Sequence, residues 1–199
     1  LSGILILMVI ALCFIIYLIV NQENKALKWI LGGVLALFLI CISIYTIYIT
    51  YDYFHVKDPA PDRTALTTSG NPYRFEDNSI VENGHCIGYY ICDSELQTAW
   101  KMRSDTVYDE LAAATLIRYL NSLGLRKDSA AVMQLSDEDI RHIENKTANA
   151  YYVRKGNIRR GIYETFFGIS LYKKYGVISE SSMLERVELW HASWNIIQD

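Results

Sequence analysis

Two apolar stretches near the start of the chain decide the fold: residues 4–20, ILILMVIALCFIIYLIV, and residues 28–51, KWILGGVLALFLICISIYTIYITY. No charged residue falls between Lys28 and Asp52. A helix that crosses a bilayer needs about 17–25 predominantly apolar residues. The sequence therefore predicts a two-helix transmembrane hairpin over residues 1–53.

A cleaved signal peptide is the alternative for the first stretch. Signal peptides begin with a basic segment and have an apolar region of about 7–15 residues. This chain opens on Leu1 without a basic segment, its first stretch is longer, and a second stretch follows directly. We therefore expect two spans in a lipid bilayer, in a fragment that is preceded by more of the protein.

The basic residues near the spans do not settle the orientation. Lys25 and Lys28 lie in and beside the turn between the spans, whereas Lys57 and Arg63 follow the second span. Basic residues favour the cytoplasmic side, and here the two counts are nearly equal. Charge alone therefore favours an extracytoplasmic domain only slightly.

The remainder of the chain is predicted to be one α-rich domain with a small β-hairpin. Residues 54–72 carry proline, glycine, serine and threonine, which is typical of a linker. Asn83-Gly84 lies between two β-forming runs and is the strongest short signal for a hairpin. We assign residues 73–199 to this domain, which has its own core and is incomplete at its C-terminus.

Helical periodicity and capping residues predict the helices of this domain. Their expected ranges are 93–103 with Asp93 or Ser94 as N-cap, 106–123, 136–146 with Ser136 as cap, 157–175, and a last helix from Ser181 or Ser182. The helix over 106–123 is expected to have one apolar side, with Val107, Leu111, Ala114, Ile117 and Leu120. The helix over 157–175 is interpreted as a core or partly buried helix, with a position in the membrane interface as the alternative.

The composition excludes several classes of function. The 199 residues have a net charge of −3 with both signs interspersed, which argues against a nucleic-acid surface. No phosphate-binding glycine loop, nucleophile motif or paired-cysteine metal motif is present, so we expect no metal and no cofactor. Cys86 and Cys92 are six residues apart, and whether they form a disulfide stays open.

Two candidate sites carry basic residues. Arg159 and Arg160 precede Glu164, so the simplest interpretation is an ion pair within one helix, and phosphate binding is the alternative. In the last predicted helix, Arg186 is followed four residues later by Trp190. The guanidinium either stacks on the indole as a surface residue or serves a ligand.

The run from Glu185 to Ile197 resembles a segment of the bacterial O-antigen ligase and O-antigen polymerase family, in which an arginine precedes a tryptophan by four residues. In that family the segment opens the helical part of a large periplasmic loop. The hydrophobic hairpin ahead of the domain and the stretches 71–74 and 82–84 resemble the Bacteroidetes branch. About 15 residues carry the motif.

The resemblance implies a polytopic glycosyltransferase of the bacterial inner membrane with its soluble part in the periplasm. Such an enzyme transfers a glycan from undecaprenyl pyrophosphate to lipid A-core or to a growing glycan, without a metal. By this resemblance Arg186 is the catalytic residue that holds the pyrophosphate. Trp190, Arg159 and Arg160 are then candidate substrate-binding residues.

The chain also departs from the family pattern. The histidine that the family uses lies further along the loop, and the arginines of other spans are absent, so we expect this fragment to be inactive alone. His55, His85, His142 and His191 are scattered and are interpreted as surface or hydrogen-bonded residues. The alternative function is a membrane-anchored extracytoplasmic sensing or protein-interaction domain. The sequence does not separate ligase from polymerase.

Overall fold

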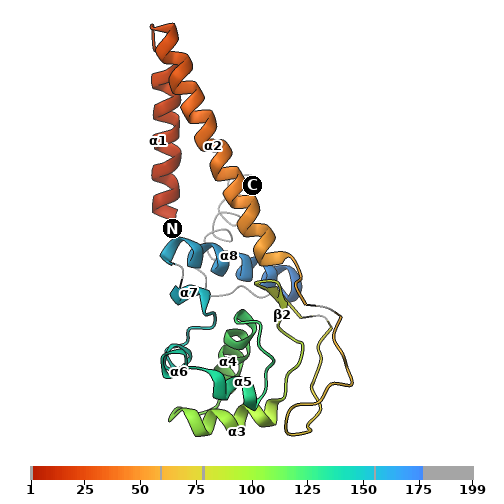
Figure 1. The fold of residues 1–199 in the computed structure, drawn as a ribbon. Coiled ribbons are helices and arrows are strands. Elements are labelled where there is room, and N and C mark those ends of the chain that lie inside the picture. Colours follow the sequence, from red (N-terminus) through yellow and green to blue (C-terminus); the bar gives the residue numbers. More distant parts are fainter. Residues whose placement is uncertain (1, 59, 78, 155, 177–199) are drawn as a thin grey trace, which may run out of the picture. The chain divides into compact units, whose positions relative to one another are not determined.

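The chain is mainly helical with one two-stranded antiparallel sheet, as the sequence predicts. The structure is a computed structural model that describes residues 2–58, 60–77, 79–154 and 156–176 (Figure 1). It divides into two compact units, residues 1–51 and 52–199. The predicted last helix from Ser181 or Ser182 lies outside the described residues.

The first unit contains α1, Ser2–Val20, and most of α2, Lys25–Phe54. Serine and threonine hydroxyls within α2 donate to carbonyls of the preceding turn, such as Ser43 Oγ to Leu39 O at 2.9 Å, so their polarity is satisfied inside the helix. In the described part of the chain, α2 alone is long and apolar enough to cross a membrane, and Val9–Val20 is a shorter apolar stretch. The helices are confirmed, and their pairing as a transmembrane hairpin stays a prediction.

The predicted hairpin forms, with shorter strands than expected. Strand β1, Val81–Glu82, pairs with β2, His85–Cys86. Asn83 and Gly84 between them have φ of 57° and 85°, the left-handed conformation that a two-residue turn requires. The second β-forming run does not continue as a strand, because the chain turns after Cys86, where the Tyr89 amide donates to Cys86 O at 3.3 Å.

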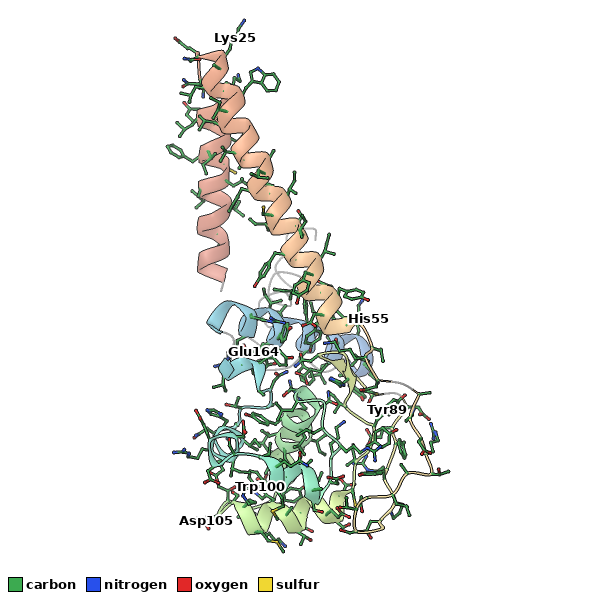
Figure 2. The ribbon with its side chains drawn as sticks, viewed as in Figure 1. Lys25, His55, Tyr89, Trp100, Asp105 and Glu164 are labelled. Atoms are coloured by element: carbon green, nitrogen blue, oxygen red, sulfur yellow. The ribbon has the colours of Figure 1, made fainter. Side chains whose placement is uncertain are left out.

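The second unit continues with six helices among the described residues. They are α3 Asp93–Arg103, α4 Glu110–Ser122, α5 Ser129–Gln134, α6 Asp137–Glu144, α7 Tyr151–Arg154 and α8 Gly156–Tyr175. Helix α3 packs against α5, α4 against α6, and α7 against α8. Trp100 on α3, together with Leu116 and Leu120 on α4, lies in a core that this helical part encloses (Figure 2).

Capping explains where the helices begin. The Ser136 hydroxyl and the Asp139 carboxylate form a capping box on α6, so the predicted serine cap is confirmed. Helix α4 begins at Glu110 and not near residue 106, because the Asp109 side chain accepts a hydrogen bond from the Ala112 amide at 2.7 Å. The predicted caps of α3 are wrong, since Cys92 occupies that position without a side-chain cap bond.

The predicted apolar side of α4 is confirmed in part, because Leu120 is buried and Ile117 packs on the core, whereas Val107 and Leu111 are exposed. Val107 precedes α4 and is 80% exposed, and Leu111 is 53% exposed. The helix has an apolar face, but that face starts further along, at Thr115 and Leu116. The predicted helix over 157–175 is confirmed as α8, and α5 and α7 were not predicted.

The segment between α2 and the hairpin has no helix or named strand among its described residues, yet it is tied down at both ends. The Gly84 amide donates to Tyr53 O at 2.9 Å, and the Lys57 amide donates to Gly84 O at 2.7 Å. Further along, the Asn71 side chain donates to Glu95 on α3 at 2.8 Å. The predicted linker is therefore fastened to the second unit near both of its ends.

Candidate functional site

Arg159, one of the two predicted phosphate-binding residues on α8, lies in a closed triangle with Asp52 and Tyr163. Its Nη2 donates to Asp52 Oδ2 at 2.8 Å, and its Nε donates to Tyr163 Oη at 3.0 Å. The Tyr163 hydroxyl completes the triangle by donating to Asp52 Oδ2 at 3.1 Å. The side chain of Arg159 is only 15% exposed, so these contacts hold it in one orientation.

Electrostatics keep this arginine charged. Burial works against the charged form, but the Tyr163 hydroxyl and the Asp52 carboxylate outweigh it and raise the pKa of Arg159. Burial raises the pKa of Tyr163 to about 12, so that its hydroxyl stays protonated at neutral pH. The charge of Arg159 is compensated by Asp52, and an anionic ligand at this position has to share Arg159 with that carboxylate or displace it.

Arg160, the second candidate, is the next residue along α8 and is exposed. Its Nε donates to Glu164 Oε1 at 2.7 Å, which confirms the predicted ion pair within one helix. Its guanidinium also lies 5.9 Å from the ring centroid of Tyr152. The structure therefore does not bring Arg159 and Arg160 together into one site, and their role toward phosphate stays a prediction.

A buried ion pair that sequence reasoning missed lies between the hairpin and α4. Arg118 donates from Nε and Nη2 to the two oxygens of Glu82, at 3.0 and 2.8 Å. The Asn149 amide also donates to Glu82, at 2.8 Å. Burial opposes the charge on Arg118, but the Glu82 carboxylate outweighs it and raises the pKa of the guanidinium.

Phe167 of α8 covers the same arginine, with 3.4 Å between its ring centroid and the guanidinium carbon of Arg118. The hairpin, α4 and α8 are thereby joined through one side chain. The sequence offers little signal for this pair, because Glu82 and Arg118 are 36 positions apart and each lies in a segment where a polar residue is expected at the surface.

A cavity of about 250 Å³ lies beside this pair. Its lining is mostly aliphatic and aromatic, with charged groups at a few points, and consists of Arg74, Glu76, Ser79, Ile80, Ile87, Ile91, Ala114, Ile117, Arg118, Phe167 and Tyr175. Pockets for drug-sized ligands measure about 300–1,000 Å³. Both arginines of the lining bind carboxylates, Arg118 that of Glu82 and Arg74 that of Asp93 at 2.9 Å, so the cavity by itself does not define a ligand.

His85 fastens the segment after α2 to the hairpin, and Lys127 fastens the loop between α4 and α5 to it. His85 Nδ1 lies 2.7 Å from Asp58 Oδ1, and Asp58 Oδ2 accepts from the Cys86 amide at 3.0 Å. The buried Lys127 ammonium donates to the carbonyls of Cys86 and Tyr89, at 3.2 and 3.0 Å. Burial lowers the pKa of Lys127 to about 8. This cluster has a structural role, and the interpretation of His85 as a hydrogen-bonded residue is confirmed.

Metal and disulfide chemistry find no support in the part of the chain that the structure describes. It contains no group of three or more histidine, cysteine, aspartate or glutamate side chains that could hold a metal ion. Cys86 and Cys92 are both buried free thiols. The Cys86 thiol instead lies 2.7 Å from the Ser79 hydroxyl.

Arg186, the predicted catalytic residue, and Trp190 lie outside the described residues. Their roles rest on the sequence alone. Comparison of the chain with protein-family models, with curated proteins and with solved structures finds no match in any of the three.

Proposed function

We propose that this chain is part of a polytopic membrane glycosyltransferase of the O-antigen ligase and polymerase type. Its donor is a glycan linked to undecaprenyl pyrophosphate, and its acceptor is lipid A-core or a growing glycan. The observation that carries the proposal is the Arg186-to-Trp190 segment, which follows an apolar helix and a helical domain in the chain order of that family. The enzyme lies in the bacterial inner membrane, and this part of it forms a transmembrane hairpin with a periplasmic domain.

The path of the chain supports this proposal. The pyrophosphate of a lipid-linked donor lies at the bilayer surface. The chain therefore has to bring the residue that binds it back to that surface. Asp52 directly follows the apolar stretch, and its carboxylate holds Arg159 on α8, the helix that leads toward Arg186. The segment before the motif is thus fastened to the point where the chain leaves its apolar helix.

The chemistry of arginine suits the proposed role. A guanidinium is permanently charged and donates two parallel hydrogen bonds to phosphate oxygens. When the acceptor hydroxyl attacks the anomeric carbon of the donor, negative charge grows on the departing pyrophosphate. A group that stabilises such charge typically contributes a factor of about 10²–10³ in rate.

The test is transfer activity of the full-length protein in membranes that contain the lipid-linked glycan and the acceptor. Arg186→Ala is expected to lower transfer by about 10²–10³, and Arg186→Lys is expected to restore only part of it. Arg141→Ala is the matched control, because Arg141 is an exposed arginine on α6. All three variants are expected at the wild-type level in the membrane.

Two outcomes would overturn the proposal. Undiminished transfer by Arg186→Ala excludes the role of this arginine, and a full-length protein that transfers no glycan excludes the enzyme class. The second outcome favours the alternative, a membrane-anchored sensing or interaction domain.

A further inference from the structure

Helix α8 has an apolar strip on the side that faces away from its own unit. Ile169 and Tyr172 are 39% and 49% exposed. At about 100° per residue, Ile162, Thr165 and Lys173 fall on the same side as these two. The opposite side carries Phe167, which packs on Arg118. The strip, defined here as Ile162, Ile169 and Tyr172, therefore has two of its three side chains exposed.

This arrangement differs from that of an ordinary surface helix. A helix on a globular domain places its apolar residues toward the core and its charged residues toward water. In α8, Arg159 and Arg160 lie apart from the strip, and the one acidic residue of the helix, Glu164, pairs with Arg160. Two lysines, Lys173 and Lys174, close the helix. The outward surface is thus apolar with a basic end and without a carboxylate.

Helix α8 is also fastened to the segment through which the chain leaves its apolar helix. The three residues after Tyr51 belong to the same unit as α8. Tyr53 is fully buried, and its ring centroid lies 4.9 Å from that of Tyr163. Phe54 lies 5.2 Å from Phe166, also between centroids. An extended chain advances at most about 3.6 Å per residue, so the backbones of Tyr53 and Phe54 lie within roughly 10 Å of the backbone of Tyr51.

We propose that the apolar strip of α8 rests on the lipid bilayer. Ile169 and Tyr172 would enter the boundary between headgroups and acyl chains, where tyrosine is enriched. Lys173, on the margin of the strip, would lie among anionic headgroups, which attract basic side chains near the surface. Amphipathic helices bind membranes in this way, with an apolar side and basic residues at its margin.

A bilayer explains the strip better than a second copy of the chain does. Stable protein interfaces bury about 800 Å² on each partner and involve about 20–30 residues a side. The strip has three members, of which only Ile169 and Tyr172 are exposed, and this is too little for a dimer interface. A lipid surface requires no complementary shape. The inference rests on α2 as a membrane span and does not depend on glycan transfer.

The test uses photo-crosslinking in the full-length protein, reconstituted in nanodiscs of phosphatidylethanolamine and phosphatidylglycerol. The photoreactive amino acid p-benzoylphenylalanine replaces Ile169 or Tyr172, and adducts are identified by mass spectrometry. The matched control replaces Leu111, which is 53% exposed on α4. Lipid adducts are expected at positions 169 and 172 and not at position 111.

Charge reversal supplies the second measurement. Lys173→Glu is expected to lower the yield of lipid adducts at position 169 at least twofold, and Lys101→Glu on α3 is the control. Thermal unfolding shows whether each variant still folds. If position 169 reacts with a second copy, with residues 177–199 or only with water, the inference is overturned. Lipid adducts together with undiminished transfer by Arg186→Ala would support the inference while overturning the proposed function.

Discussion

Arg118 on α4 donates two hydrogen bonds to Glu82 on β1, and the carboxylate that accepts them has no exposed surface. The same guanidinium stacks on Phe167 of α8. Burying two charges costs several kcal/mol for each ion and is offset only by close geometry and further hydrogen bonds. Asn149 supplies one of those bonds. This pair therefore makes the junction of hairpin, α4 and α8 sensitive to any change of either partner.

Arg118→Met is expected to lower the free energy of unfolding by about 3–5 kcal/mol, because it leaves the Glu82 carboxylate buried and unpaired. The measurement is unfolding of the full chain in detergent, followed by circular dichroism. Arg160→Met is the matched control, since the Arg160 side chain is 54% exposed in its pair with Glu164 and such pairs contribute about 0.3–0.5 kcal/mol. Equal losses in the two variants would contradict a special role for the buried pair.

Gly84→Ala is expected to destabilise the protein more than Gly70→Ala. Both glycines have positive φ, 85° and 81°, so an alanine side chain costs about 1–3 kcal/mol at either position. A Cβ at Gly84 would also lie 2.7 Å from His55 O, whereas nothing lies within 4 Å at Gly70. The Gly84 variant should also be cleaved faster by trypsin after Lys57, because the contact between residues 53–57 and the turn loosens. The contact has no role in stability if the two variants unfold at the same denaturant concentration.

Glu95→Gln is expected to reduce the amount of folding stability that the protein loses in acid. Burial alone would raise the pKa of Glu95, but hydrogen bonds from Ser129, Thr67 and Asn71 lower it from 4.5 to about 2. A carboxylate with a depressed pKa stabilises the fold fully above its unfolded value and loses that contribution as the pH falls from about 4.5 to about 2.

Thermal midpoints at neutral pH and at about pH 3 measure this difference. The Gln variant should be less stable than wild type at neutral pH, and the gap should narrow in acid. Glu138→Gln, at an exposed carboxylate on α6 (74% exposed), should leave the pH dependence unchanged. A gap that widens in acid would rule out the stabilising role of the ionised Glu95.

A double-mutant cycle on Asp52→Asn and Arg159→Met is expected to give a coupling of roughly 0.5–3 kcal/mol. The side chains are 24% and 15% exposed and share the Tyr163 hydroxyl. The control cycle uses Arg63 and Asp77, whose side chains are 58% and 62% exposed, where about 0–1 kcal/mol is expected. Coupling at Asp52 no larger than in the control would mean that α8 is held by aromatic contacts alone.

Local signals in the sequence predicted the elements of the fold well. The apolar stretch of α2, the Asn83-Gly84 turn, the Ser136 cap and α8 all formed where local propensity or periodicity indicated. The predictions that failed also depend on local features of the sequence. Short helices such as α5 and α7 have too few turns for a periodic signal, and Val107 matched the pattern of α4 although the Asp109 cap starts the helix after it.

The candidate site depends on a contact between distant residues that local sequence signals do not reveal. Arg159 and Arg160 are neighbours in sequence and were treated as one basic pair. Arg159 binds Asp52, 107 positions away, and Arg160 binds Glu164, four positions away. Only the second partner is visible in the sequence, because helix geometry brings residues at that spacing together.

The sequence by itself determined the apolar helix, the helical class of the domain, the turn of its hairpin and the Arg186-to-Trp190 segment on which the proposed function rests. These depend on interactions between residues a few positions apart, or on composition. Tertiary structure alone decided that Glu82 and Arg118 form a buried pair, that Asp52 holds α8, and that Ile169 and Tyr172 of that helix stay exposed. Contacts between distant residues depend on how whole elements pack, and spacing along the chain does not encode that arrangement.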